Sequence, residues 1–288
     1  MMPRKTKTSP ALFAARPVPA ALIAVLMIIE IIYSLSVNLI YFERGYYRHL
    51  SNLTHGWIDG TLSANLIGLF VEVAVFLLLI AKVTPRELGL RKNKLLPGVF
   101  GFLLFWFAVH LVNLGVNLFT GSRIVFNDNI TKYPGDLIGG LLGQLFGNAL
   151  LEEIVFRGFL FVQIFLLCSA IKRRPARVSA AIFISQAIFA LMHIPNRIYT
   201  GLTGVEFVYD FIQLVAWGSV FCLLYLLTEN LFFVVGIHAL MNEPLMIWYN
   251  EYTTVIVAVC IPLMTCLLLL FKRKQRRPHR TVSSTPVQ

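Results

Sequence analysis

The sequence contains few charged residues. Lysine, arginine, aspartate and glutamate make up 14% of its 288 residues, whereas soluble domains usually carry about 25%. Hydrophobic residues account for 57% of the chain, and the mean hydropathy is +0.74. So apolar a surface could not be solvated in water. The composition therefore excludes a soluble enzyme, a disordered chain and a fibrous repeat.

Cysteine is also scarce, and its spacing has no pattern. The four cysteines lie within apolar runs and show neither a CxxC pair nor the spacing of a metal site. We therefore expect them to pack as small apolar side chains and not to form a disulfide framework. The sequence shows no internal repeat. We also expect no cleavable signal peptide, because the first apolar run is too long and no small-residue cleavage site follows it.

Long hydrophobic runs make up most of the chain. A membrane-spanning helix needs about 20 apolar residues, so there is room for roughly eight spans. Helices are expected because lipid offers no partner for unpaired backbone groups, and the alternation of barrel strands is absent. The sequence therefore predicts an all-α integral membrane protein, a bundle of about eight transmembrane helices with a polar catalytic cavity. The expected spans are Pro19–Phe42, Leu62–Val83, Leu95–Phe119, Leu137–Ile171, Val178–Ile194, Val208–Leu227, Leu231–Tyr249 and Thr254–Phe271.

Basic residues are distributed unevenly between the segments that connect these runs. The net charge is +11, and alternating the spans from a cytoplasmic N-terminus places 19 basic residues inside and five outside. Such a bias predicts that both termini are cytoplasmic, and the charge then needs no nucleic acid to explain it. The inner set is Arg4, Lys5, Lys7, Arg16, Lys82, Arg86, Arg91, Lys92, Lys94, Lys172, Arg173, Arg174, Arg177, Lys272, Arg273, Lys274, Arg276, Arg277 and Arg280, and the outer set is Arg44, Arg48, Arg123, Lys132 and Arg197.

The spans and basic segments divide the chain into five parts. We expect a cytoplasmic basic tail over residues 1–18, three transmembrane helices with their loops over 19–136, and a catalytic core over 137–249. A last transmembrane helix follows over 250–271, and a second cytoplasmic basic tail over 272–288.

The fourth run contains polar groups that lipid would disfavour. Gln144, Asn148 and Glu152 are spaced by four and therefore share one helical face. Glu153 and Arg157 have the spacing and order of an intrahelical ion pair, which leaves Glu152 without a local partner. Ionisable groups inside spans are functional candidates by default. Four glycines in the same run predict that another helix approaches it closely, namely Gly139, Gly140, Gly143 and Gly147.

Two further runs each contain a histidine. Phe189 and His193 share a face in the fifth run, and His238 and Asn242 share a face in the seventh. With Glu152 they supply a proton acceptor, a second base and neutral donors for a developing oxyanion. These are the parts that hydrolysis by an activated water requires. Because polar residues follow His193 at once, we expect the segment Pro195–Phe207 to line a cavity and not to face lipid.

Three motifs in order resemble the CPBP intramembrane protease family, which includes CAAX-processing endopeptidases and bacteriocin-related Abi proteins. The family pattern is EExxxR, FxxxH and HxxxN on separate transmembrane helices. Here these motifs consist of Glu152, Glu153 and Arg157, then Phe189 and His193, then His238 and Asn242. The resemblance covers about Leu137 to Trp248. It implies an intramembrane endopeptidase, a hydrolase that cleaves a peptide bond of a membrane-associated or lipidated peptide or protein, with supporting roles for Glu153, Arg157 and Phe189.

The resemblance also implies a mechanism. Glu152 and His193 would activate a water, while His238 and Asn242 would stabilise the oxyanion. The alternative is a zinc ion bound by Glu152, His193 and His238, which are ligand types found in catalytic zinc sites. We expect no metal, because HExxH is absent and no two histidines share a helix at ligand spacing.

The motifs and the resemblance also predict partners, a location and alternative functions. The expected partners are the lipid bilayer and a membrane-associated substrate, either a prenylated CAAX protein or a pheromone or bacteriocin leader. The expected location is a bacterial plasma membrane. A non-enzymatic immunity or scaffold protein is the alternative function, and a small transporter ranks below it because the matching halves of transporters are absent. Other polar groups inside the spans are expected to bind neighbouring helices: Glu30, Glu72, His110, Asn113 and Asn117.

Overall fold

The computed structural model describes residues 15–275. Several of the basic residues used to predict sidedness therefore lie outside the described residues, namely Arg4, Lys5, Lys7, Arg276, Arg277 and Arg280. The described part is an all-α structure, as predicted, in which the two strands β1 (Val125–Phe126) and β2 (Trp248–Tyr249) form one short antiparallel pair.

Six helical segments of the described chain are long and apolar enough to cross a membrane. The protein is therefore a multi-pass integral membrane protein. The segments consist of α1 (Ala20–Ser36) with η2 (Val37–Phe42), α3 (Gly60–Gly68) with η3 (Leu69–Ile80), α4 (Lys92–Thr120), α9 (Arg174–Met192) with α10 (Ile194–Tyr199), α11 (Gly204–Thr228) and α13 (Thr253–Gln275). A short helix, α2 (Tyr47–Leu53), and one turn of helix, α5 (Asn129–Lys132), lie in the connections.

Six segments meet this length and composition, not the predicted eight, and two of the predicted runs account for the difference. The run Leu231–Tyr249 forms only the 12-residue helix α12 (Leu231–Asn242). At about 1.5 Å per residue this helix is roughly 18 Å long, too short for a hydrocarbon core of about 30 Å. The run Leu137–Ile171 is helical, but Glu152, Glu153 and Arg157 interrupt its apolar sequence.

That charged run is nevertheless one continuous helical path, which we call the central rod. It consists of α6 (Pro134–Gly143), η4 (Gln144–Asn148), α7 (Ala149–Glu152), η5 (Glu153–Leu160) and α8 (Phe161–Leu167), followed by the 3₁₀ turn η6 (Cys168–Ala170). Wider π-helical turns, η4 and η5, lie on both sides of the short α-helical stretch that ends at Glu152. Such turns often occur at functional sites.

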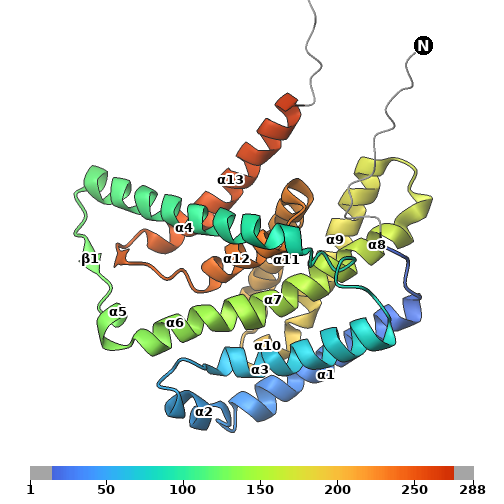
Figure 1. Cartoon of the computed structure of the whole chain (residues 1–288), viewed down its shortest axis with the longest axis horizontal. Helices are drawn as coiled ribbons and strands as arrows, with labels where there is room; N and C mark the ends of the chain where they lie inside the picture. Colours follow the sequence, from blue (N-terminus) through green and yellow to red (C-terminus); the bar gives the residue numbers. More distant parts are fainter. Residues whose placement is uncertain (1–14, 276–288) are drawn as a thin grey trace, which may run out of the picture.

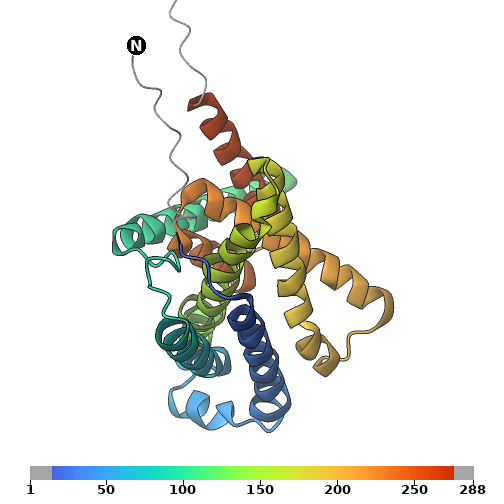
Figure 2. The same cartoon turned by 90° about the vertical axis from the view of Figure 1, so that its right-hand side faces the viewer.

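The central rod lies between two groups of helices (Figure 1). Helices α1 and α3 lie on one side of it, and α4 and α12 lie on the other. Helices α9 and α11 pack together near the α8 end of the rod and diverge toward α10 (Figure 2). The rod therefore contacts α3, α9, α11 and α12, the elements that surround its charged residues.

Glycines allow the rod and α3 to approach closely, as predicted. A methyl group on Gly143 would lie 2.5 Å from Asp59 Oδ1, and one on Gly139 would lie 1.9 Å from the carbonyl oxygen of Gly56. Neither contact leaves room for a side chain. The small residues of the rod thus bring the start of α3 and the turn before it against the rod.

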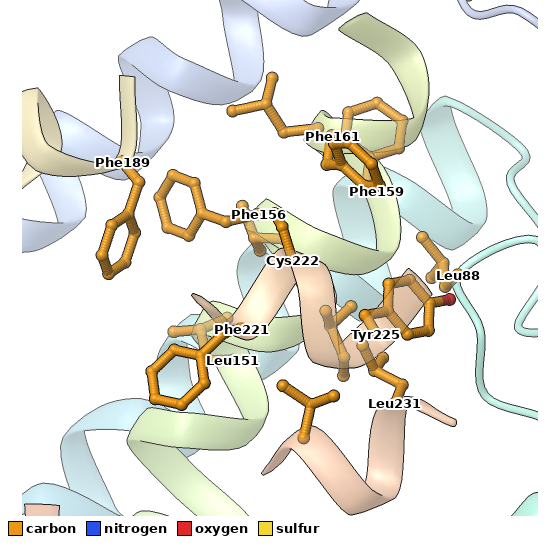
Figure 3. Packing of buried hydrophobic residues seen from close by; sticks show 14 of the residues in the cluster. Leu88, Leu151, Phe156, Phe159, Phe161, Phe189, Phe221, Cys222, Tyr225 and Leu231 are labelled. Atoms are coloured by element: carbon orange, nitrogen blue, oxygen red, sulfur yellow. The ribbon is translucent and has the colours of Figure 1, made fainter. Parts of the chain in front are cut away.

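Aromatic and aliphatic side chains fill the space where the rod meets α9, α11 and α12 (Figure 3). Phe156, Phe159 and Phe161 of the rod pack there with Phe189 of α9 and Phe221 of α11. All five are at most 3% exposed. Between helices in a bilayer such contacts stabilise by van der Waals packing, so this core holds the charged part of the rod in a fixed setting.

Helix α12 is fixed at both ends by α4. At its start, Asn230 caps the helix by accepting from the Phe233 amide and donates through Nδ2 to the Lys94 carbonyl at 2.9 Å. At its end, the chain continues as an irregular loop over residues 243–252, whose backbone needs partners inside the bundle. Helix α12 is thus placed by polar contacts despite its short length.

Polar side chains of α4 supply those partners. Trp106 Nε1 donates to the Leu245 carbonyl at 3.0 Å, and His110 Nε2 accepts from the Ile247 amide at 3.1 Å. Further along α4, Asn113 donates to Thr253 and Asn117 accepts from Asn250. The prediction that His110, Asn113 and Asn117 bind neighbouring elements is therefore confirmed.

A short N-terminal strap over residues 15–19 lies against α8. Gln163 of α8 accepts from the Val18 amide at 2.9 Å and donates to the Arg16 carbonyl at 3.1 Å. The Arg16 amide donates to Glu87, which also accepts from the amide and hydroxyl of Thr84. Partial burial opposes the charged form, but hydrogen bonds from Thr84 and Arg16 outweigh it and lower the pKa of Glu87.

Candidate active site

A polar cavity of about 500 Å³ lies beside the central rod. Its walls come from the rod, α1 with η2, α3, α9, α10, α11 and α12. The polar motif residues singled out in the sequence line it together, namely Gln144, Asn148, Glu152, His193, His238 and Asn242, as do Phe189 and Glu30. Three motifs that are far apart in the sequence therefore meet at one cavity.

Glu152 lies between the two histidines. His193 Nε2 is 3.8 Å from Glu152 Oε1, and His238 Nε2 is 3.8 Å from Glu152 Oε2. These distances exceed a direct hydrogen bond, for which about 2.7–3.2 Å is usual. The carboxylate and each imidazole could instead share a small group between them, such as a water molecule.

Both histidines are held through Nδ1. His193 Nδ1 donates to the Phe189 carbonyl at 2.9 Å, and His238 Nδ1 donates to Glu153 Oε1 at 2.8 Å. The neutral rings therefore carry their free lone pair on Nε2, the atom that faces Glu152. This arrangement leaves two nitrogen acceptors and one carboxylate around the same space.

The ion pair predicted between Glu153 and Arg157 is present behind this space. Arg157 Nη1 lies 3.1 Å from Glu153 Oε1, and both side chains are fully buried. The same Glu153 oxygen accepts from His238, so one carboxylate links the arginine to a site histidine. Losing either member of such a buried pair leaves an uncompensated charge.

Aromatic rings fix the histidines and the arginine. The Phe189 ring lies edge-on to the His193 ring at 4.5 Å between centroids, and the Phe221 ring stacks on that of His238 at 4.7 Å. Arg157 Cζ lies 4.3 Å from the centroid of the Phe189 ring. Phe189 thus contacts both a site histidine and the buried cation, which a phenyl face attracts.

Asn242 lines the cavity but is already engaged. Its Nδ2 donates to Gln144 Oε1 at 3.0 Å, and Asn148 Nδ2 lies 3.4 Å from the same oxygen. These three amides join the end of α12 to the rod. The predicted shared face of Gln144, Asn148 and Glu152 is confirmed, because all three line the cavity.

The sequence reasoning missed a polar rim at the cavity. Asn196 donates to Asn38 at 2.7 Å, and Arg197 donates to both Asn196 and Asp210 at 2.7 Å. This chain of contacts joins η2, α10 and α11, and all four side chains line the cavity. The prediction that Pro195–Phe207 would line a cavity is confirmed for Asn196 and Arg197. Polar residues directly after Pro195 were the available signal.

Two other carboxylates lie close to the cavity. Glu30 of α1 lines it, and Glu72 of η3 is fully buried. The two side chains interact with one another, and Glu30 also experiences the charge of Glu152. Within the described residues neither side-chain oxygen of Glu72 has a hydrogen-bond partner, so the binding of neighbouring helices by Glu30 and Glu72 stays a prediction. The two carboxylates bring additional acidic groups near the site.

The residue types fit a zinc ion better than their spacing does. Two imidazole nitrogens and one carboxylate are suitable zinc ligands, and the Nδ1 contacts to Phe189 and Glu153 are of the kind that orient metal-binding histidines. However, among the described residues no three His, Cys, Asp or Glu side chains are arranged to hold one metal ion. The 3.8 Å separations would have to shorten for Glu152, His193 and His238 to share an ion.

A comparison with protein families agrees with this site. Residues 134–243 match the family model described as Rce1-like, type II CAAX prenyl endopeptidase Rce1-like. The matched segment runs from the start of α6 to the residue after α12 and includes Glu152, His193, His238 and Asn242. The predicted resemblance to the CPBP proteases is therefore confirmed over these residues. No curated protein matches the chain, and no solved structure does.

Proposed function

We propose that this protein is an intramembrane endopeptidase that hydrolyses a peptide bond of a membrane-associated or lipidated peptide or protein. The observation that carries the proposal is the convergence of Glu152, His193 and His238 at one polar cavity in a membrane bundle. The match to a CAAX endopeptidase family supports the same reaction class.

In the proposed reaction, a water molecule lies between Glu152 and His193. Its oxygen attacks the peptide carbonyl carbon while Glu152, assisted by His193, accepts its proton. The resulting tetrahedral oxyanion is stabilised from His238 Nε2 when that ring is protonated, and the Glu153 carboxylate on Nδ1 stabilises the positive ring. The C–N bond then breaks, and the accepted proton passes to the leaving amine.

Asn242 has a second place in this proposal. As an oxyanion donor it would exchange its present bond to Gln144 for one to the substrate. Glu153 and Arg157 have positioning roles, because they hold His238 through Nδ1 and do not themselves face Glu152. The polar rim at Asn196 and Arg197 would accept the substrate backbone beside the lipid.

A reconstitution experiment tests the proposed function. The full-length protein in proteoliposomes is given prenylated C-terminal peptides, unprenylated counterparts and hydrophobic leader peptides, and products are identified by mass spectrometry. We expect cleavage that is lost in both Glu152→Ala and His193→Ala. Cleavage that persists in both variants, or no cleavage of any peptide class, contradicts the proposal. A cellular effect that persists in Glu152→Gln without cleavage would instead indicate the immunity or scaffold function.

The zinc alternative has its own test. If zinc is required, Glu152, His193 and His238 would hold it, and the bound ion would lower the pKa of a water ligand and polarise the peptide carbonyl. Elemental analysis of the purified protein, with dialysis against a chelator, separates the alternatives. We expect cleavage to persist without stoichiometric zinc.

The sidedness of the protein is also a proposal. We propose that both termini lie in the cytoplasm of a bacterial cell, with the central rod and the α12 segment each counted as a crossing, because basic residues then concentrate in alternate connecting segments. Cysteine-labelling from either face at introduced sites, one beside Lys172 and one beside Lys132, tests this orientation. Labelling of the first site from the outside would contradict it.

A further inference from the structure

Arg157 has more hydrogen-bond donors than Glu153 satisfies. Its guanidinium is fully buried, and Nη1 is the atom paired with Glu153. Within the described residues, Nε, Nη1 and Nη2 have no hydrogen-bond acceptor in good geometry. Buried polar groups almost always have such a partner. The surroundings of the other guanidinium nitrogens should therefore contain a second acceptor.

Gln186 of α9 presents a free acceptor in the same region. Its side chain is fully buried, and its Nε2 donates to Ser185 Oγ at 2.9 Å and to Cys222 Sγ at 3.1 Å. These two bonds fix the orientation of the amide. Its Oε1 has no donor among the described residues, so a buried acceptor remains open.

Gly218 of α11 brings the two unsatisfied groups together. A methyl group on Gly218 would lie 2.3 Å from Gln186 Oε1 and 3.1 Å from Arg157 Nη2. The open acceptor and an open donor therefore border the same small space. The Arg157 guanidinium lies over the rings of Phe189 and Phe221, and Gln186 contacts Cys222. These three neighbouring side chains are labelled in Figure 3.

We propose that Gln186 Oε1 is the second acceptor of Arg157 and that Gly218 keeps the space for this contact. Both are positioning residues for the proteolytic site, so this part of the inference rests on the proposed function. Gln186 orients Arg157, Arg157 pairs with Glu153, and Glu153 accepts the hydrogen bond from His238 Nδ1. Because the Gln186 amide is neutral, it orients the guanidinium without competing with Glu153 for its charge.

Gln186→Leu removes the acceptor at similar volume. In full-length protein in nanodiscs we expect kcat to fall about tenfold with KM nearly unchanged, since a bond to a charged group is lost behind the site. The matched control is Gln163→Leu, which removes a buried amide from the strap contact and should leave kcat unchanged.

Gly218→Ala tests the space itself. The added methyl group must displace Gln186 or Arg157, so we expect a similar loss of kcat. Gly115→Ala on α4 is the control, because its methyl group would meet nothing within 4 Å. Equal kcat values for Gly218→Ala and wild type would overturn the role of Gly218.

A double-mutant cycle distinguishes a contact with Arg157 from general packing. We expect Gln186→Leu to lower the melting temperature in the wild type but to have little further effect in the Glu153→Gln/Arg157→Met variant. Independent, additive losses would overturn the pairing. The cycle is read from unfolding, so it tests the contact even if the protein cleaves no peptide, an outcome that would count against the proposed function alone.

Discussion

Two aromatic-xxx-His segments form the same local structure and meet different surroundings. In α4, His110 Nδ1 donates to the Trp106 carbonyl at 2.9 Å, and in α9, His193 Nδ1 donates to the Phe189 carbonyl at 2.9 Å. In both, the aromatic ring four residues earlier contacts the imidazole. The difference lies at Nε2. That of His110 accepts from the Ile247 amide, whereas that of His193 faces Glu152 across the cavity.

This difference shows how a polar residue in a membrane bundle becomes available for chemistry. Both ring nitrogens of His110 are used to hold the loop 243–252, so the residue is structural. His193 is held by one nitrogen and keeps the other as a base. The same local motif thus has two uses, and the partner of Nε2 decides between them.

The largest expected effect concerns Glu152, the carboxylate that faces His193 across the cavity. Glu152→Gln keeps the shape of the side chain but removes the carboxylate that accepts the proton. We expect the cleavage rate to fall about 10³–10⁴-fold. Single-turnover cleavage in proteoliposomes measures this, with the melting temperature as the control for folding. A residual rate above a tenth of wild type would show that Glu152 is not the base.

The next effect concerns the buried pair behind the site. Arg157→Met leaves Glu153 as an uncompensated buried charge, so we expect a loss of about 3–5 kcal/mol in unfolding free energy. The double variant Glu153→Gln/Arg157→Met should recover much of that loss while cleavage stays low. Denaturant unfolding in detergent measures both proteins. Equal stability of the single and double variants would contradict a charge-based explanation.

The matched histidine pair gives the sharpest form of the comparison. His193→Ala should lower cleavage about 100-fold, because a catalytic proton acceptor is lost. His110→Ala should cost about 1–3 kcal/mol of stability by leaving the Ile247 amide unpaired. Cleavage per folded molecule should stay close to wild type in that variant. Rates normalised to the folded fraction test both outcomes, and equal losses for the two variants would remove the distinction.

The smallest expected effect concerns Glu87, whose two carboxylate oxygens both accept hydrogen bonds. The oxygens of Glu152 instead face the two histidines at 3.8 Å. Hydrogen bonds from Thr84 and Arg16 lower the pKa of Glu87 in the folded protein. Its contribution to stability is therefore fully present above the pKa of a glutamate in the unfolded chain, about 4.3. The contribution is lost as the pH falls through the lower folded value. Glu87→Gln should therefore cost less than about 1 kcal/mol at neutral pH and reduce the loss of stability below about pH 4.3. Thermal unfolding between pH 3 and 7 tests this prediction.

The site was largely predictable from the sequence because its local spacings survive folding. The four-residue spacing gave the Glu153–Arg157 pair and the shared face of Gln144, Asn148 and Glu152. The bond from His238 to Glu153 was not predictable, since it joins residues 85 positions apart. Nor was the rim contact between Arg197 and Asp210, because it depends on how α10 and α11 meet.

The span count shows where hydropathy fails. An apolar run records which residues tolerate lipid, and it does not record where a helix ends. Helix α12 ends at Asn242, and the apolar residues after it form a loop that α4 supports through Trp106 and His110. The polar residues of α4 that explain this loop were visible in the sequence, but their partners were not.

The two sides of the cavity differ in mechanical character. Glu152 lies within the uninterrupted central rod, whereas His193 lies at the junction where α9 ends and α10 begins. Residues at the ends of helices absorb changes in backbone angle more readily than residues within them. We therefore expect Glu152 to keep its position and His193 to change its position more readily. Adjustment to different peptides should come from the α9–α10 side, with Glu152 as the stationary reference.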